Sequence, residues 1–457
     1  MGSPFLFSHQ GGSSPVRAWL VLSCLAMLQF LIAVDVTVVN VALPSIGHDL
    51  GADARRLTWV VVGYTVTGGG LLMLGGRLGD LFGRRRVLLA GTVLFGAASL
   101  LAGIAPSFTL LVAARLMQGA GEALALPAAM AVIVLMFPEG LRRSRALGVW
   151  AAVASSGLVL GFVLSGVITQ LLGWRWIFLV AVPFIVFVSA ATILLVPADP
   201  PGRRVRLDLR GSVLLTAAPL LFALGVVEAG QDGGPGRLSP PALAGALFVV
   251  TERRAADPLI PPGFFRNRAR VLANLATALL SAALSTSFLL FTYHLQNRLG
   301  LSPLAAGLTL LPLAVSLVAA ATFVPRLLGR WGARVCAVTG IGLTALGMAA
   351  IAAAPAGALV LATVPAMVLI AAGMGFGLVG LQYAAVTGVT GDDAGAAAGV
   401  QRAADQLGGS TGITVYIGVG FAPALAGIDP FLTSSALAIV GLAAAGFIAW
   451  RIALPAH

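Results

Sequence analysis

The fold of this chain is decided by a short polar stretch between two long apolar segments: Gly76-Arg77-Leu78-Gly79-Asp80-Leu81-Phe82-Gly83-Arg84-Arg85-Arg86. The apolar segments cover residues 57–76 and 87–105. Glycines allow two helix ends to approach closely, an acid can cap or pair, and arginines favour the cytoplasmic side of a membrane. The stretch alone would fit any tight turn. Together with its apolar flanks it predicts a cytoplasmic turn between two membrane-spanning helices.

The composition indicates a helical membrane protein. Of the 457 residues, 59% are hydrophobic and 10% are charged, whereas soluble proteins have about 25% charged residues. The apolar residues recur in blocks of about 20, the length that crosses about 30 Å of hydrocarbon. We therefore expect an all-α polytopic membrane protein in the lipid bilayer of the cell membrane.

Arginines define the predicted topology, because they occur in alternate short loops while the loops between them are neutral or acidic. This is the positive-inside pattern, and it places both termini in the cytoplasm. It also accounts for the net charge of +12 without nucleic-acid binding. The predicted spans are 18–43, 57–76, 87–105, 108–137, 146–172, 174–197, 211–227, 238–251, 271–296, 303–324, 335–354, 357–389, 394–426 and 431–450.

The eighth of these spans, residues 238–251, is short for a full crossing. Arginine-rich loops on both sides of residues 211–251 require an even number of crossings between them. Two crossings, with local thinning of the bilayer, give fourteen spans in all. A cytoplasmic or re-entrant hairpin without a crossing is the alternative.

An internal repeat divides the chain into two halves. The segment 326–334 repeats the pattern of 77–85 in degenerate form, with Gly329 where the first copy has Asp80. We therefore predict a six-helix bundle over 18–197, a linker with two inserted spans over 198–268, and a second six-helix bundle over 269–452. Parallel repeats of this kind imply a binding site between the halves, near the middle of the membrane.

Charged residues inside spans are costly and usually functional, and the sequence places three of them in the first half. Asp35 in the first span and Arg115 in the fourth both lie about 10–12 Å below the outer surface, counting 1.5 Å per residue. They can therefore meet. Glu122 lies almost two turns beyond Arg115 on the same helix face, about 21 Å deep. Gln118 continues this polar stripe, while Gly119 and Gly121 allow close helix packing.

Two interpretations of these residues stay open. Asp35 and Arg115 can be a structural pair that holds the bundle together. Alternatively Asp35 or Glu122 changes protonation when helices move, because burial favours a neutral carboxyl and a nearby guanidinium favours a charged one. We take Asp35, Arg115 and Glu122 as proton-coupling candidates, and Gln29, Gln118 and Glu122 as candidates for the substrate cavity.

Other polar and kinking residues suggest structural roles. Arg402 and Asp405 are three positions apart on one predicted helix and can pair locally. Prolines inside four spans predict breaks or kinks; they are Pro127, Pro183, Pro312 and Pro365.

With these residues in view, the chain resembles the fourteen-span drug:proton antiporters of the major facilitator superfamily over nearly all of residues 18–452. The matching segments are Asp35–Pro44, Gly76–Arg86, Arg115-x-x-Gln118-Gly119-x-Gly121, Gly173–Phe178, and Glu252–Arg254 with Asp257–Ile260. The resemblance implies alternating access, export of cationic or amphipathic drugs in exchange for protons, and a role for Arg115 in proton coupling. It also implies that the loop with Gly76, Asp80, Gly83, Arg84 and Arg85 switches conformation, and that Asp80 helps lock an outward-facing state.

The chain departs from this family pattern at three places. Phe162 occupies a position of the fifth span where the antiporter motif has proline, although the Gly157-x-x-x-Gly161 packing face is present. The eighth span is shorter than in the family. Asp405 stands at a position that is usually basic.

Several other function classes are less consistent with the sequence. An uptake symporter for a small metabolite is the main alternative, and a receptor or lipid-modifying enzyme is a third. Every cation is arginine, so a Walker-type ATP site, which needs lysine, is excluded. No His/Asp/Ser constellation suggests an enzyme, and the histidines and cysteines form no metal-like cluster, so we predict no cofactor. We expect a monomer whose partners are protons and a small-molecule substrate.

Overall fold

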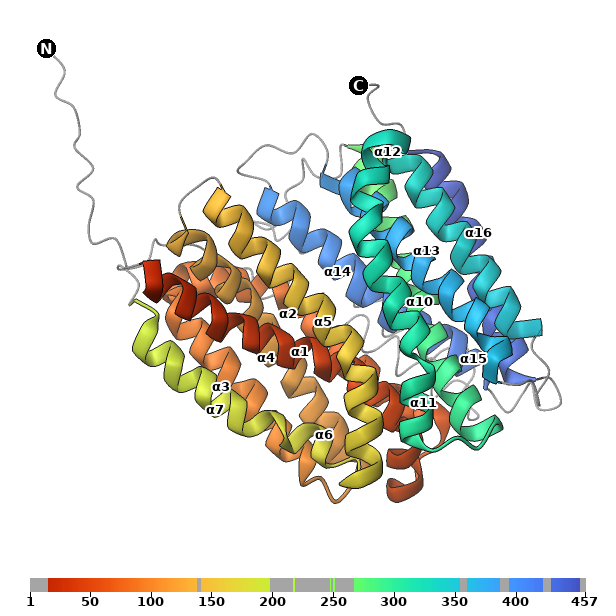
Figure 1. The fold of residues 1–457 in the computed structure, drawn as a ribbon, viewed down its shortest axis with the longest axis horizontal. Coiled ribbons are helices and arrows are strands. Elements are labelled where there is room, and N and C mark those ends of the chain that lie inside the picture. Colours follow the sequence, from red (N-terminus) through yellow and green to blue (C-terminus); the bar gives the residue numbers. More distant parts are fainter. Residues whose placement is uncertain are drawn as a thin grey trace, which may run out of the picture.

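The computed structural model describes residues 15–137, 141–197, 267–353, 360–386, 394–421 and 429–452, with the isolated residues 217, 247 and 250. The regular elements of this part of the chain are all helical (Figure 1). Nine of the described helical segments are long and apolar enough to cross a membrane. The all-α polytopic architecture expected from the sequence is therefore confirmed.

The N-terminal half is a bundle of six crossings. The last crossing is broken at Val180, three residues before Pro183. A proline has no N–H and crowds the carbonyl four residues earlier, which here belongs to Leu179. The helices are α1 (Pro15–Leu50), α2 (Ala54–Phe82), α3 (Arg84–Gly103), α4 (Phe108–Met136), α5 (Leu141–Leu171), and α6 (Trp176–Leu179) with α7 (Ala181–Leu195).

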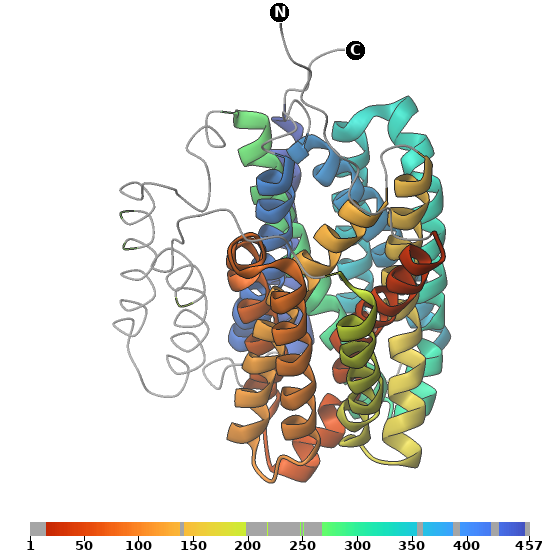
Figure 2. The ribbon, with the colours of Figure 1, turned by 90° about the vertical axis from the view of Figure 1, so that its left-hand side faces the viewer.

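The C-terminal half is a second bundle of six crossings beside the first (Figure 1). Two of its helices continue into short π-helices, which the sequence did not predict. The elements are α10 (Arg268–Tyr293) with η3 (His294–Arg298), α11 (Pro303–Thr309), α12 (Leu311–Ala353), α13 (Val360–Val386), α14 (Ala394–Gly412) with η5 (Ile413–Ile417) and α15 (Gly418–Gly420), and α16 (Pro430–Trp450). The helix axes of both halves are roughly aligned with one another, as the spans of one membrane are (Figure 2).

The internal repeat is visible in the backbone. Gly83 separates α2 from α3 with φ 95° and ψ 135°, and Gly332 divides α12 into two crossings with φ 77° and ψ 161°. Both glycines adopt a positive φ that other residues rarely adopt. The turn that was predicted from residues 76–86 therefore recurs at the equivalent place in the second half.

Of the breaks or kinks predicted at four prolines, a break is absent at two. Helix α4 continues through Pro127, and α13 continues through Pro365. Helix α1 likewise runs beyond its expected end, through Pro44 to Leu50. A proline removes a single backbone hydrogen bond, and neighbouring helices in a membrane bundle can hold the rest of the helix in place.

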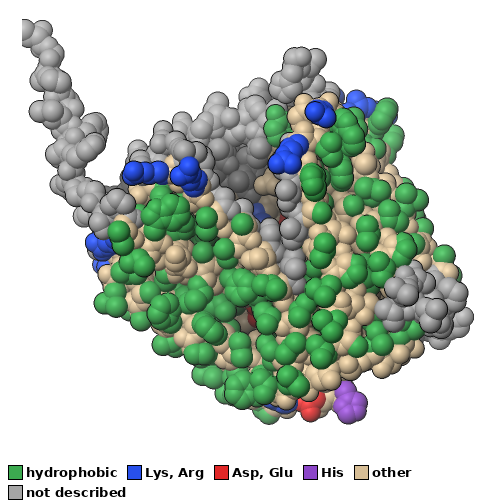
Figure 3. Space-filling view, viewed as in Figure 1, with side chains coloured by type: hydrophobic (Ala, Val, Ile, Leu, Met, Phe, Trp, Pro, Cys, Tyr) green, Lys and Arg blue, Asp and Glu red, His purple; other side chains and the backbone are tan. Residues whose placement is uncertain are grey.

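Several arginines at helix termini and turns lie together on one side of the molecule, which we call the arginine-rich end. Nε of Arg17 donates to the Leu195 carbonyl at 2.9 Å, and Arg85 bonds the Ile193 carbonyl, so the start of α1, the end of α7 and the Gly83 turn lie together. In the second half, the Arg334 guanidinium lies 4.3 Å from the ring centre of Trp450, beside the Gly332 turn. Figure 3 shows cationic side chains gathered mainly along the upper edge of both lobes, above hydrophobic flanks.

The two halves also contact each other at the opposite end. Nε2 of Gln296 donates to the Val41 carbonyl at 2.7 Å, and the rings of Phe162 and Phe288 lie 5.7 Å apart. Phe162, which stands where the antiporter motif has proline, thus packs across the boundary between the halves. The inserted spans 211–227 and 238–251 lie outside the described residues except for isolated positions, so the fourteen-span count and the exact domain limits stay predictions.

The Gly332 turn gives a test of this backbone. Replacing Gly332 with alanine should lower the free energy of unfolding by about 1–3 kcal/mol, because the side chain is strained at this positive φ. Gly329→Ala is the matched control, since a Cβ there meets no atom within 4 Å and the residue is helical. Thermal unfolding of the purified variants in detergent measures both. Equal melting temperatures for Gly332→Ala and Gly329→Ala would contradict the assignment.

Candidate functional site

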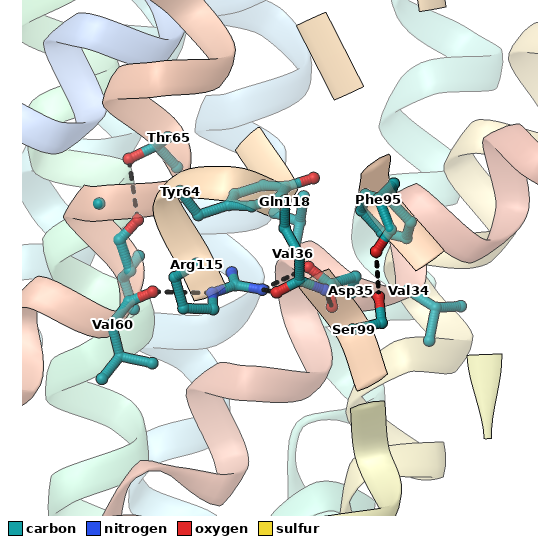
Figure 4. A network of polar contacts seen from close by, with 12 residues as sticks. Val34, Asp35, Val36, Val60, Tyr64, Thr65, Phe95, Ser99, Arg115 and Gln118 are labelled. Carbon is teal, nitrogen blue, oxygen red and sulfur yellow. Dashed lines mark hydrogen bonds and ion pairs between the residues drawn. The ribbon is translucent and has the colours of Figure 1, made fainter. Parts of the chain in front are cut away.

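The Asp35 and Arg115 side chains form a buried ion pair in the N-terminal half (Figure 4). Nη1 of Arg115 donates to Oδ2 of Asp35 at 2.5 Å, and the side chains are 1% and 7% exposed, respectively. The depth estimate from the sequence, which placed the two residues at the same level, is therefore consistent with the structure. Their predicted part in proton coupling stays a prediction.

Gln118 completes the hydrogen bonding of this pair. Its Nε2 donates to Oδ1 of Asp35 at 3.1 Å and to the Ser99 hydroxyl at 2.9 Å, and its Oε1 accepts from Arg115 at 3.0 Å. Both carboxylate oxygens of Asp35 thus have a donor. Helices α1, α3 and α4 each contribute a side chain to this network, which is what a charge pair in a medium of low dielectric constant needs in order to persist.

Helices α2 and α6 supply further partners of Arg115. Nε of Arg115 donates to the Val60 carbonyl at 2.9 Å. The guanidinium carbon lies 4.2 Å from the ring centre of Tyr64 and 5.8 Å from that of Phe178. The aromatic faces attract the cation where water is excluded. We refer to Asp35, Ser99, Arg115 and Gln118 with the Tyr64 ring and the Val60 carbonyl as the Arg115 network.

Small residues allow the helices to approach closely enough for these contacts. A Cβ on Gly119 would lie 2.1 Å from Oγ1 of Thr67, so only glycine lets α4 pack on α2 here. A Cβ on Gly161 would lie 1.9 Å from Oγ1 of Thr37, two residues after Asp35. The predicted packing roles of Gly119 and of the Gly157-x-x-x-Gly161 face are therefore confirmed, and this face holds α5 against α1 beside the acid.

Glu122 lies at the boundary between the halves. It is fully buried, and its Oε1 accepts a hydrogen bond of 3.2 Å from Nε2 of Gln406 on α14. One turn along the same contact, Thr65 on α2 bonds Ser410 on α14 through their hydroxyl groups. Arg115 and Glu122 are on one helix, so α4 links the ion pair of the first half directly to the second half.

The remaining polar candidates have local partners or are buried. Nη1 of Arg402 lies 3.8 Å from Oδ2 of Asp405, in agreement with the predicted local pair, and the Ser281 hydroxyl donates to Oδ1 of Asp405 at 2.6 Å. Gln29, Gln118 and Glu122 are all buried in this conformation. A substrate could therefore reach them only after the helices move.

The predicted switch loop is only partly described. The N–H of Gly83 donates to the Gly79 carbonyl at 3.1 Å and closes the end of α2, and Gly76 packs near Pro127 of α4. Arg85 donates to the Ile193 carbonyl. The side chain of Asp80 lies outside the described part of the chain, so its role in locking one state stays a prediction.

Sequence reasoning missed two contributors to this site. Gln406 directly follows Asp405 and lies one turn beyond Arg402, so its position inside a span could have signalled it. Tyr64 gave no signal, because an aromatic residue in an apolar span usually packs against lipid or a neighbouring helix. Within the described residues no group of three or more His, Cys, Asp or Glu side chains could hold a metal ion.

Comparisons with known proteins agree with this architecture. The sequence model of the Major Facilitator Superfamily matches residues 25–413 of this chain. The chain is 54% identical over 438 residues to a lincomycin resistance protein of Streptomyces lincolnensis, covering 93% of this chain and 90% of the relative. It is 41% identical over 419 residues to a cephamycin export protein of Amycolatopsis lactamdurans, covering 89% and 85%. The crystal structure of the POT family transporter PepTSo superposes with a TM-score of 0.73 at 14% identity, covering 97% of this chain and all of that chain, which supports the fold alone.

The buried pair can be tested by a double-mutant cycle. Asp35→Asn or Arg115→Gln alone should lower the free energy of unfolding by about 3–5 kcal/mol, because each leaves an uncompensated buried charge. The double variant should lose less than the sum, since neither charge remains. Denaturation in detergent measures the coupling. Additive losses would show that the two side chains do not stabilise each other.

Proposed function

The chain belongs to the Major Facilitator Superfamily, and on that premise we propose that it exports small hydrophobic or cationic drugs or antibiotics in exchange for protons by alternating access. The relatives with antibiotic resistance and export names support the export of antibiotics. The observation that carries the proposal is the fully buried Glu122, held between the Arg115 network and the second half of the protein.

Protons are the proposed coupling ion because the buried acids can exchange them when the helices move. In the described conformation Asp35 has Arg115 as its counterion and Gln118 as a second donor. Movement of α4 relative to α1 would separate the pair and leave a carboxylate that favours proton uptake. Within the described residues Glu122 accepts one hydrogen bond, from Gln406, and it would move to a different environment when the halves separate.

The driving force is sufficient for useful export. Each proton that enters down the membrane potential gains about 2.3 kcal/mol per 100 mV, which corresponds to roughly fiftyfold accumulation of a neutral solute on the other side. Binding of either ligand must favour one of the two conformations for this exchange to be coupled. Gln29, Gln118 and Glu122 are the residues that we propose for the substrate cavity in the other conformation.

The proposed placement is the cell membrane, with the arginine-rich end and both termini in the cytoplasm. In this orientation the Gly76–Arg86 loop lies on the cytoplasmic side, where Gly76, Asp80, Gly83, Arg84 and Arg85 would control the inner opening. We propose a monomer, because each chain has both halves that alternating access requires.

Export predicts lower drug content in energised cells. Cells that express the protein should retain less of a fluorescent cationic dye and less lincomycin than cells with the empty vector. Because protons drive the exchange, an uncoupler should abolish the difference. Accumulation of labelled compound over time is the measurement, and Gly329→Ala is a control variant. Higher content in expressing cells would contradict export and favour an uptake symporter on the same fold.

Replacing the buried acids should remove the coupling of transport to protons. Asp35→Asn and Glu122→Gln should give folded protein, and at least one of them should lose transport that is driven by a pH gradient in proteoliposomes. Asp49→Asn is the matched control, because Asp49 lies in an exposed ion pair with Arg175 at the end opposite the arginine-rich one. Full activity of both buried-acid variants would remove the proposed coupling mechanism.

A further inference from the structure

The carboxyl of Glu122 and the side-chain amide of Gln406 face each other across the boundary between the halves. One hydrogen bond joins them, from Nε2 of Gln406 to Oε1 of Glu122 at 3.2 Å. Their other oxygens, Oε2 of Glu122 and Oε1 of Gln406, are buried and have no hydrogen-bond partner among the described residues. A Cβ on Gly68 would lie 3.2 Å from the first oxygen and 3.4 Å from the second, so both border the same small space.

This arrangement suits a protonated carboxyl. An ionised Glu122 offers only acceptors, and it would leave its Oε2 and the amide oxygen of Gln406 as two buried acceptors beside each other. The neutral acid has one O–H donor, which the amide oxygen can accept while the amide N–H donates to Oε1. Acid and amide then satisfy each other, as buried polar groups must.

The charged and titratable groups around Glu122 come from four helices. Tyr64 of α2 contributes a buried hydroxyl that acts on the carboxyl as a potential donor, although no hydrogen bond of normal geometry joins the two groups. Arg402 of α14 and Asp35 of α1 act on Glu122 electrostatically, and Arg115 lies two turns away on α4 itself. Helix α3, which packs on α4, has no ionisable residue after Arg86. Of the described side chains, Gln406 makes the one hydrogen bond of normal geometry to the carboxyl, and it does so from the other half.

Gln406 also lies where α2 of the first half and α14 of the second half approach each other closely. A Cβ on Gly69 would lie 2.8 Å from Cβ of Gln406, so the bare backbone of α2 makes room for this side chain. The Thr65–Ser410 bond and the packing of Met73 near Gly399 extend the same contact between α2 and α14 toward the arginine-rich end. A change in the hydrogen bonding of the Glu122–Gln406 pair therefore affects the stability of the contact between α2 and α14.

We propose that Gln406 is a positioning residue for the coupling proton, and that in the substrate-free protein it closes the contact of α2 and α4 with α14 when Glu122 is protonated. Loss of the proton from Glu122 converts the complementary pair into facing acceptors and loosens the contact, so that the arginine-rich ends of the halves can separate. This inference rests on the proposed proton-coupled export, and it adds the residue that transmits the protonation state of Glu122 to the second half.

The test measures the distance between the two halves as a function of pH. Spin labels are attached at Phe82→Cys and Arg330→Cys, which are exposed positions near the Gly83 and Gly332 turns, in a protein whose Cys24 and Cys336 are replaced by alanine. The reconstituted protein should show short distances at low pH and a growing population of long distances as the pH rises. Glu122→Gln should keep the short distances at every pH, because an amide can donate to Gln406 without a proton to lose.

The decisive variant is Gln406→Leu, which should lose the dependence of the distance on pH, with the nearly isosteric Gln406→Met as substitute if the leucine variant does not fold. Ser410→Ala is the matched control, since it removes the neighbouring hydrogen bond to Thr65 and should keep the pH midpoint of the parent. Infrared spectra give an independent readout: the carbonyl band of a protonated carboxyl that disappears in Glu122→Gln should shift in Gln406→Leu.

The possible failures are distinguishable. A distance that ignores pH in the parent protein, or a Gln406→Leu variant with the parent's midpoint and infrared band, would overturn this inference while uncoupler-sensitive export still stands. Export that an uncoupler does not affect would instead overturn the proposed function, and this inference with it.

Discussion

The structure of the first half depends on the cost of keeping the Asp35 and Arg115 charges away from water. Removing an ion from water costs several kcal/mol even after relaxation, and a lone charge inside a membrane protein is rarely tolerated. The bundle meets this constraint by giving each charged atom a partner. Arg115 and Gln118 donate to the two oxygens of Asp35, and the guanidinium also bonds the Val60 carbonyl and lies on the Tyr64 ring. Glycines at the helix contacts, Gly119 and Gly161 among them, follow from the same need, because the partners reach the pair only if the backbones come close.

This constraint also ties the first half to the second. Helix α4 has Arg115 on one turn and Glu122 two turns further, and Glu122 bonds Gln406 of α14. A rigid helix cannot move one residue without the other, so a shift that opens the contact with α14 also disturbs the ion pair with α1. Coupling between a proton site and the opening of the protein requires an element with two arrangements that both sites influence. Helix α4 meets the geometric part of that requirement.

The sequence was sufficient for the features that depend on periodicity along one chain. The depth of Asp35 and Arg115 followed from span limits and the helical rise, and the Gly332 turn followed from its similarity to residues 77–85. Features that depend on which helices pack together were not predictable. Nothing in the sequence pairs Glu122 with Gln406, 284 positions away, or places the Tyr64 ring on Arg115. The breaks expected at Pro127 and Pro365 failed for a related reason, since neighbouring helices decide whether a proline interrupts a helix. The π-helices after α10 and α14 also had no signal in the sequence.

The two halves share a backbone plan but differ in the chemistry of their buried polar groups. The first half has the buried ion pair, whereas the described hydrogen bonds between side chains of α10 and α14 have neutral donors: Nε2 of Gln401 donates to Oγ1 of Thr277 at 2.9 Å, and the Ser281 hydroxyl donates to Asp405. A neutral amide suits its place opposite Glu122, because it can bond a carboxyl without adding a second charge to be buried. A lysine or arginine at position 406 would stabilise the ionised acid and remove the reason for a proton to bind. If Glu122 is the proton site as proposed, the change of charge falls to the first half, and the second half responds to it through Gln406.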